Sequence, residues 1–393
     1  MQLKYYINPE GISMAKIKSV SLLFVISCII SCGLYNNSSA RTQSPFAATP
    51  IDTKLVEATR FLAGKPLSPS SLLFPLSTDK RYLAYVDELR KSWARLQQKN
   101  LDEIAQWKKQ NLPARYNKTI FYPFSGPDIL NAIAFFPDGD EYIMFGLEPC
   151  GNIPDPHAVS KERVFSGLWG LRASLNEILN MNFFKTIDMQ KEVSTNEFNS
   201  MISIIMWFLG QLDYEVINAH KIWIDDNSLI TTTPSVMKQN KYIPGAEIFF
   251  KDNAGYIKRV RYFQINVIDN SLSYYTNFIP HLESYNRYTT IIKSASYLMH
   301  NDNKFTKIRD LTLQHSDLIL QDDSGVALKF FSPYQWKLTF FGVYTKPVPL
   351  FAHRYQPELK EKFDTLSKGP LPFSYGYNSG IGNSNLMLAE RVQ

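Results

Sequence analysis

The feature that most constrains the fold is a strand–helix–strand pattern between Thr119 and Leu147. The apolar run Thr119-Ile120-Phe121-Tyr122 predicts a buried strand, and the Pro-Phe-Ser-Gly segment that follows predicts a turn. Pro127 is typical of a helix start, and Pro137-Asp138-Gly139-Asp140 ends that helix. The run from Glu141 to Leu147 predicts a second strand. At this spacing we expect a βαβ unit, with parallel strands joined by a right-handed crossover.

Three polar residues are expected at one end of this unit. Ser125 and Asp128 follow the first strand, and Glu148 follows the second. Because parallel strands end at the same edge of a sheet, the hydroxyl and the two carboxylates should approach one another there. Such a group suits acid–base chemistry or a cation bound through oxygen. The competing interpretation is structural: Ser125 and Asp128 cap the helix, and Glu148 starts a loop.

Five more helices are predicted before residue 214. Their ranges are Thr53 to Gly64, Asp79 to Gln98, Leu101 to Gln110, Ser160 to Met181, and Phe198 to Leu209 behind the capping box Ser194-Thr195-Asn196-Glu197. The strongest pattern is in the second helix, where Leu89 and Trp93 belong to an apolar series at spacings of three and four. We expect this face to pack in the core.

The pattern changes after Tyr214 to short strand-like segments. These are Val216 to Ile224, Glu247 to Phe250, Gly255 to Val267, Asp317 to Gln321, Val326 to Phe331 and Trp336 to Tyr344, with short helices at Phe305 to Leu313 and Gln356 to Leu366. Asp252 to Gly255 and Asp322 to Gly325 have the composition of hairpin turns. The sequence therefore predicts an α+β fold, with a helical first half containing one βαβ-like unit and an antiparallel sheet with hairpins in the second half.

The N-terminus has the layout of a secretory signal. Lys16 and Lys18 precede an uncharged run of 17 residues, Ser19 to Tyr35. A bilayer span needs about 20 residues, so a transmembrane anchor is the weaker interpretation. The polar stretch before Met14 does not fit a signal, and whether Met1 or Met14 is the true start stays open.

Within this leader, Ile29-Ile30-Ser31-Cys32 resembles the lipobox of bacterial lipoproteins. The resemblance implies that Cys32 is acylated and becomes the new N-terminus, so that the protein is exported and lipid-anchored in the cell envelope. Gly33 stands where an aspartate would imply retention at the inner membrane, which favours the outer membrane in a Gram-negative source. The alternative is cleavage after Ser38-Ser39-Ala40 and simple secretion.

This resemblance covers only the N-terminal region, and the body resembles no family known to us. We expect a signal peptide at 1–32, a flexible tether at 33–52 rich in Asn, Ser, Thr, Ala and Pro, and a globular body at 53–393, with a possible subdivision near 212–245. Removal of residues 1–31 deletes three lysines and one glutamate and lowers the net charge from +6 to +4. The charge is mild and scattered, so nucleic acid is not an expected partner.

Other candidate sites have simpler structural interpretations. Asp138, Asp140 and Glu141 lack the spacing of a calcium loop and match a turn. Cys150 and His157 could form a thiolate–imidazole pair, but a structural free cysteine is favoured. The histidines show no metal-ligand spacing. Ser324 has no histidine close in sequence and fits a hairpin turn.

The expected function is therefore that of a membrane-tethered envelope protein that binds a partner or assists assembly, with no cofactor and no metal. Its partners would be the membrane, through the lipid, and an envelope protein or a glycan. Glycan binding through Tyr375 and Tyr377 requires both rings to face solvent. The alternative is a hydrolase or metal-dependent enzyme that uses the carboxylates near Ser125, Asp128 and Glu148.

Overall fold

The computed structural model describes residues 43–181, 198, 200–233, 242–377 and 382–392. These residues belong to one compact unit that begins at Gln43. Cys32 and the capping box at 194–197 lie outside the described residues. The last part of the expected tether contacts the body, because Ser44 Oγ donates to the Ile257 carbonyl at 2.5 Å and the Phe46 ring packs edge-on against Phe249.

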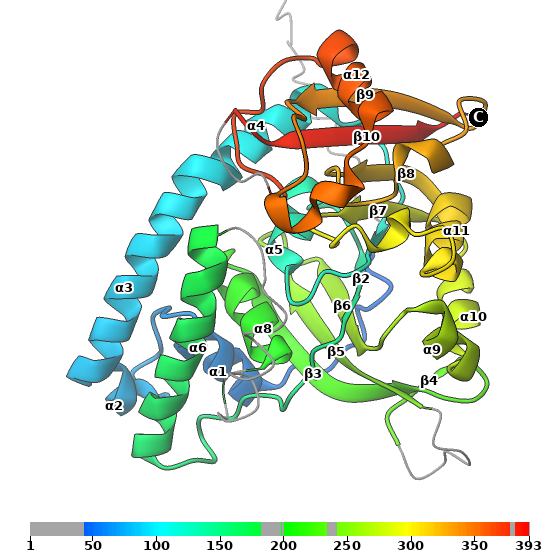
Figure 1. The fold of residues 1–393 in the computed structure, drawn as a ribbon. Coiled ribbons are helices and arrows are strands. Elements are labelled where there is room, and N and C mark those ends of the chain that lie inside the picture. Colours follow the sequence, from blue (N-terminus) through cyan, green and yellow to red (C-terminus); the bar gives the residue numbers. More distant parts are fainter. Residues whose placement is uncertain (1–42, 182–197, 199, 234–241, 378–381, 393) are drawn as a thin grey trace, which may run out of the picture. The chain divides into compact units, whose positions relative to one another are not determined.

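The body is built around one mixed sheet of ten described strands, in the order β4-β3-β5-β6-β2-β1-β7-β8-β10-β9. The strands are β1 Thr119–Tyr122, β2 Glu141–Gly146, β3 Glu215–Ile224, β4 Ile230–Thr231, β5 Ile243–Lys251, β6 Ile257–Gln264, β7 Tyr288–Ile292, β8 Ser316–Gln321, β9 Trp336–Gly342 and β10 Asn385–Arg391. Strands from both sides of residues 212–245 lie in this single sheet (Figure 1).

The five central strands, β6-β2-β1-β7-β8, are all parallel. The chain leaves β1 for β2 and β6 on one side and returns to the other side of β1 for β7 and β8. The strand order therefore reverses between β1 and β7. Antiparallel strands extend the sheet at both ends, with β5, β3 and β4 beyond β6, and β10 and β9 beyond β8.

Helices cover both faces of the sheet. They are α1 Thr53–Leu62, α2 Phe74–Ser77, α3 Lys80–Leu96, α4 Asp102–Asn111, α5 Ile129–Phe135, α6 Lys161–Met181, α8 Met201–Gln211, α9 Asp269–Tyr274, α10 Phe278–Glu283, α11 Thr306–His315 and α12 Pro357–Leu366. A π-helical turn, Gln97–Leu101, joins α3 to α4, and 3-10 turns lie at Leu298–His300 (η3), Leu328–Phe330 (η4) and Pro349–Arg354 (η5). Figure 1 shows α3, α6 and α8 on one side of the sheet and α9 to α11 on the other.

Alternate side chains of β1 pack on opposite faces of the sheet. Ile120 and Tyr122 belong to a core shared with α1, α3 to α6 and α8, whereas Phe121 belongs to a second core shared with α9 to α12. Leu89 of α3 is 2% exposed and lies in the first core, and Trp93 packs edge-on against Trp207 of that core. A central strand buried on both faces is what a continuous apolar run such as Ile120-Phe121-Tyr122 produces.

The expected α+β class is confirmed. So is the unit at 119–146: β1 and β2 are parallel with Ile120 opposite Tyr142, and α5 lies between them in sequence. The hairpin at Asp252 to Gly255 also forms, because β5 and β6 are antiparallel and Gly255 takes a φ of 80° that only glycine adopts freely.

Two expectations for the second half are wrong. The sheet there is antiparallel only in part, since β6, β7 and β8 join the parallel centre. No strand covers 326–331, so Asp322 to Gly325 is not a hairpin turn. The loop instead closes on β8, where the Gln321 side chain donates to the Val326 carbonyl at 2.7 Å and accepts from its N–H at 2.9 Å.

Candidate functional site

The structure places Ser125, Asp128 and Glu148 just beyond the carboxyl ends of β1 and β2. Their exposed fractions are 4%, 4% and 3%, so all three are buried. This edge of parallel strands, at the point where their order reverses, is where open α/β sheets bind ligands. The three residues are thus buried polar groups at a position typical of binding sites.

Asp128 is both a helix cap and half of an ion pair. Its Oδ1 accepts the N–H of Asn131 at 3.2 Å, which caps α5. Its Oδ2 accepts from Tyr122 Oη at 2.9 Å and from Lys293 Nζ at 3.0 Å. The sequence interpretation of Asp128 as a cap is therefore correct but incomplete.

Lys293 follows β7, so this ion pair crosses the point where the strand order reverses. The side chains of Lys293 and Asp128 are 3% and 6% exposed. Burying two charges costs several kcal/mol per ion before their attraction is counted. A buried ion pair with this cost either holds two loops together or keeps charged groups in place for a ligand.

Glu148 turns back over the end of β2. Tyr262 Oη donates to the Glu148 carbonyl at 3.0 Å and lies 3.5 Å from Oε2. A Cβ on Gly146 would lie 2.6 Å from Glu148 Oε2 and 3.5 Å from the Cα of Gly126. The absence of a side chain at Gly146 therefore lets the Glu148 carboxylate lie beside the turn that contains Ser125.

The side chain of Ser125 is close to these carboxylates but is not hydrogen-bonded to them. Its Oγ donates to the Gly126 carbonyl at 3.0 Å, and its backbone carbonyl accepts the N–H of Asp128 at 3.2 Å. Among the described residues, no side-chain hydrogen bond joins Ser125 to the Asp128 or Glu148 carboxylate, and these two carboxylates bond to different partners. The three predicted residues share one edge of the sheet without forming a single hydrogen-bonded cluster.

A second acidic group, which the sequence analysis assigned to a hairpin, lies at the carboxyl end of β8. Asp322 and Asp323 are 1% and 4% exposed. Asp322 Oδ1 accepts from Ser324 Oγ at 2.5 Å, and its Oδ2 accepts the N–H of Ser294 at 3.1 Å. These bonds connect the ends of β7 and β8.

Asp323 bonds to more distant parts of the chain. Tyr297 Oη donates to Oδ2 at 2.6 Å, and Asn385 Nδ2 donates to Oδ1 at 2.9 Å. The Asp323 N–H returns a bond to Asn385 Oδ1 at 2.7 Å. The two neighbouring aspartates thus hold the loop after β7 and the start of β10 against the end of β8.

Burial changes the protonation of this pair. Loss of solvation, followed by the repulsion of Asp323, raises the pKa of Asp322 to about 7. Loss of solvation also raises the pKa of Asp323. A carboxyl group with a pKa near neutrality is suited to proton transfer at neutral pH, and such groups concentrate at functional sites.

Unusual backbone conformations gather at the same edge. Phe124 and Gly126 after β1 have φ values of 58° and 51°, and Ser294, Ser296 and Tyr297 after β7 have values of 53° to 55°. Residues other than glycine rarely adopt this region, and each such residue costs of the order of 1–3 kcal/mol. Strained backbone of this kind clusters at binding and active sites.

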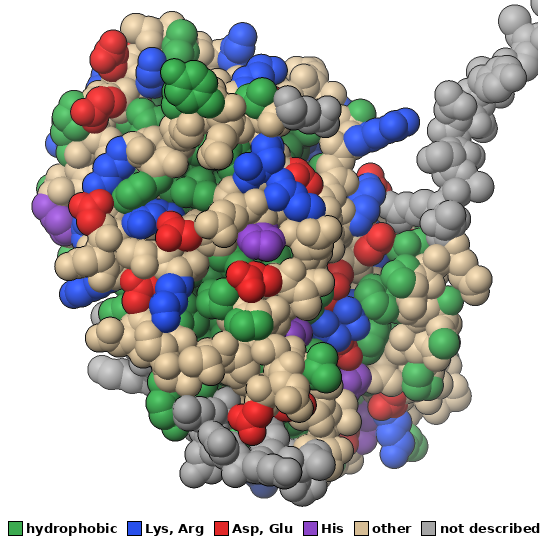
Figure 2. Space-filling view, turned by 90° about the vertical axis from the view of Figure 1, so that its right-hand side faces the viewer, with side chains coloured by type: hydrophobic (Ala, Val, Ile, Leu, Met, Phe, Trp, Pro, Cys, Tyr) green, Lys and Arg blue, Asp and Glu red, His purple; other side chains and the backbone are tan. Residues whose placement is uncertain are grey.

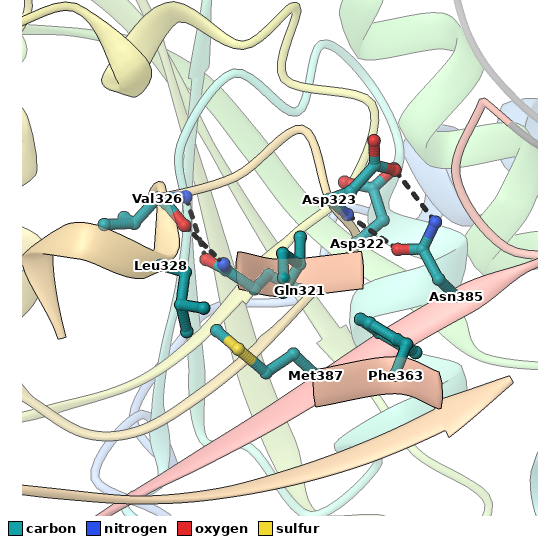
Figure 3. A pocket seen from close by; sticks show the side chains of 9 residues that line it. Gln321, Asp322, Asp323, Val326, Leu328, Phe363, Asn385 and Met387 are labelled. Atoms are coloured by element: carbon teal, nitrogen blue, oxygen red, sulfur yellow. Dashed lines mark hydrogen bonds between the residues drawn. The ribbon is translucent and has the colours of Figure 1, made fainter. Parts of the chain in front are cut away.

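The space beside the aspartates is small. Figure 3 shows Asp322, Asp323 and Asn385 on one side of a cavity and Leu328, Phe363 and Met387 on the other. Its volume is about 10 Å³, which is room for a single water molecule. A larger cleft of about 400 Å³ lies nearby, between η3, η4, η5 and the start of α12. Any organic ligand at the aspartates would need the surrounding loops to move.

The other predicted candidates do not form the sites expected of them. Cys150 is 6% exposed, and burial raises the pKa of its thiol to about 12. The His157 ring lies 3.9 Å from the Glu57 carboxylate and the Cys150 thiol lies 3.9 Å from the Tyr262 carbonyl, and no described contact joins Cys150 to His157. Tyr375 is 1% exposed and its hydroxyl donates to the Ile292 carbonyl at 3.1 Å, so this ring does not face solvent as glycan stacking would require.

The described residues contain neither a metal-binding cluster nor a membrane-spanning helix. No three His, Cys, Asp or Glu side chains there are grouped so that they could hold a metal ion. Among the helices in the described ranges, none is both long enough and apolar enough to cross a bilayer. On the face that carries α9 to α11, acidic and basic side chains are interspersed (Figure 2).

Lys293, Asp322 and Asp323 are the site residues that the sequence analysis missed. The signal that could have found them is that each lies within two residues of the end of a buried strand, much as Glu148 and Ser125 lie two and three residues beyond theirs. No protein-family model matches the chain, and no curated protein or solved structure is significantly similar to it. The function must therefore be argued from the geometry of this edge.

Proposed function

We propose that this protein is a lipid-anchored protein of the cell envelope that binds a small ligand through the vicinal hydroxyls of a sugar ring. The anchor is Cys32, on the strength of the Ile29-Ile30-Ser31-Cys32 motif, and the outer membrane is the favoured location. The binding site is the edge that carries Ser125 and Glu148. Its ligand is a nucleoside or a glycan, which share the same hydroxyl chemistry.

The single observation that carries the proposal is the strand order. In chain order the parallel strands run third-second-first-fourth-fifth, as in the doubly wound sheets that bind nucleotides where the order reverses. In those sheets an acidic residue about 20 residues after the first strand–helix turn binds ribose hydroxyls. Glu148 stands 22 positions after Gly126 and lies beside the same turn.

The turn itself narrows the ligand class. Dinucleotide-binding turns carry three glycines so that the backbone can approach a pyrophosphate, whereas Pro123 to Pro127 contains only Gly126. A pyrophosphate is therefore not the expected group. A diol is the remaining ligand group, because a carboxylate accepts hydrogen bonds from two adjacent hydroxyls. Since Glu148 is 3% exposed, binding requires the surrounding loops to open.

The test is calorimetric titration with adenosine, 2′-deoxyadenosine and methyl riboside. Adenosine should bind, and loss of one hydroxyl or the Glu148→Gln substitution should weaken binding about tenfold or more. Glu361→Gln, at an exposed site on α12, is the matched control. Equal affinity for adenosine and 2′-deoxyadenosine would refute the diol contact. Binding of methyl riboside as tight as adenosine would assign the site to a glycan.

A second candidate is a hydrolase that uses carboxylates at this edge. The observation that favours it is Asp322, since burial raises its pKa to about 7, where a carboxyl group serves as a general acid or base. Asp128 is less suited, because Lys293, Tyr122 and Asn131 already occupy its oxygens. Hydrolysis of ester or phosphoester probes that disappears in Asp322→Asn, with binding of adenosine retained, would favour this candidate.

A further inference from the structure

A cleft beside the aspartates has no role in the function proposed above. Its volume is about 400 Å³, within the range of small-molecule sites. It is formed by η3, η4, η5 and the first turn of α12. His300 lines the cleft, and its Nε2 lies 3.2 Å from the carbonyl oxygen of Asp323, so the cleft borders the carboxyl end of β8.

Two permanent cations line this cleft. Lys329 is paired with Asp302 at 2.6 Å. Arg354 Nη2 donates to the neutral amide oxygen of Asn301 at 2.8 Å, and Arg354 forms no ion pair within the described part of the chain. Glu358 is the one carboxylate among the lining residues. The guanidinium of Arg354 therefore keeps donors that no described side chain accepts, and its charge is offset only at longer range, by Asp302.

Burial and the charges that line the cleft both change the pKa of the His300 side chain. Burial first, and then the charges of Arg354 and Lys329, lower its pKa to about 4, although a bond to the Asp323 backbone opposes the change. His300 is therefore neutral at pH 7. The direction of the shift agrees with the geometry, since both cations act on this wall of the cleft.

The remaining lining suits the organic part of a ligand. Leu328 and Pro357 supply apolar contacts, and Tyr355 is 45% exposed at the rim. The helix α12 starts here at Pro357 and has no side-chain cap, so its first N–H groups add a weak positive field. A guanidinium group beside an aromatic ring and an apolar wall suits a ligand that carries one oxyanion on a small apolar group.

We propose that this cleft binds the oxyanion, phosphate or carboxylate, of a small aromatic or aliphatic molecule, with Arg354 as the main contact. Arg354 donates two parallel hydrogen bonds to the anion, and Lys329 adds charge at longer range. The inference does not rest on the sugar-binding function. It gives the protein a second recognition site beside the first.

The test is calorimetric titration of the full chain with phenyl phosphate, benzoate and inorganic phosphate. Phenyl phosphate or benzoate should bind more tightly than inorganic phosphate, because the ring contacts Tyr355 and Leu328. Arg354→Gln should weaken binding about tenfold or more, and Arg354→Lys, which keeps the charge but loses the fork, by less. Lys337→Gln, at a lysine that is 72% exposed on β9, is the control.

Each outcome of these titrations either contradicts the proposal or identifies the anion. Unchanged affinity in Arg354→Gln, with the variant folded by circular dichroism, overturns the proposal. So does the absence of binding by all three probes at about 10 mM. Preference for phenyl phosphate over benzoate identifies phosphate as the anion, and the reverse identifies carboxylate. Since adenosine carries no anion, its binding is unaffected by Arg354→Gln and reports on the sugar site alone.

Discussion

Lys293 and Asp128 meet at 3.0 Å across the point where the strand order reverses, and both side chains are almost completely buried. They are 165 positions apart in the chain. The pair joins the loop after β7 to the first turn of α5. It links the two halves of the parallel sheet at their carboxyl ends, and its energetics can be measured.

Asp128→Asn should destabilise the protein by about 3–5 kcal/mol, because it leaves the Lys293 ammonium buried and without its anion. The double variant Asp128→Asn, Lys293→Met should recover part of that loss. Unfolding in urea is the measurement. The control is Asp302→Asn, which removes an exposed partner of Lys329 and should cost less than about 1 kcal/mol. Equal losses of unfolding free energy in Asp128→Asn and Asp302→Asn would show that the buried pair contributes no more to stability than the exposed one.

Leu89→Ala should cost about 2–5 kcal/mol, because this side chain is 2% exposed in the core between α3 and the sheet. Leu83→Ala on the same helix is the matched control, since Leu83 is 54% exposed and should cost less than about 0.5 kcal/mol. Thermal or urea unfolding distinguishes them. A small effect at Leu89 would mean that α3 does not pack as described.

Stability should depend on pH through Asp322. Its pKa is raised from 3.8 to about 7 in the folded chain, so the folded state holds this proton more tightly than the unfolded state does. The contribution to stability is therefore full below pH 3.8 and is lost as the pH rises toward 7. Asp322→Asn should flatten the fall in unfolding free energy between about pH 4 and 7.

The slope is the quantity to compare, because Asn also loses the bond from the Ser294 N–H and shifts stability at every pH. Asp226→Asn, at an exposed turn residue, should leave the slope as in the wild type. Parallel curves for wild type and Asp322→Asn would contradict the raised pKa.

Cys32→Ser should release the protein from membranes, because it removes the thiol that we propose carries the lipid. Cys28→Ser, four residues earlier in the same apolar run, is the control and should leave attachment unchanged. Fractionation followed by immunoblotting provides the measurement. Membrane attachment of Cys32→Ser would argue against the lipobox and for an uncleaved signal anchor.

The sequence was most informative where structure is local. Between Thr119 and Leu147 every element is defined by its own residues: apolar runs make strands, and prolines mark where the helix begins and the next turn lies. The placement of Ser125, Asp128 and Glu148 at one edge followed from that pattern alone. Their separate hydrogen-bond partners did not, because Lys293 and Tyr262 come from strands far along the chain.

Asp322 to Gly325 shows why the rest was not predictable. Aspartate, serine and glycine favour a tight turn whatever follows it, so composition does not show whether the chain returns as a hairpin or continues as a loop. The outcome depends on distant contacts, namely the pairing of β8 with β7 and the bonds from Asn385 and Tyr297 to Asp323. The composition of this segment predicted a turn correctly but did not indicate that the two aspartates would be buried at the edge of the sheet.

The last described strand, β10, lies between β8 and β9 and bonds to both. As a ribosome delivers the polypeptide, β9 is complete more than forty residues before β10 exists, and it has no neighbour to pair with until then. The Asn385 contacts to Asp323 are equally late. Closure of this side of the sheet is thus postponed until residues 385–391 have been made, which keeps β9 and the end of β8 incompletely ordered while the intervening residues are synthesised.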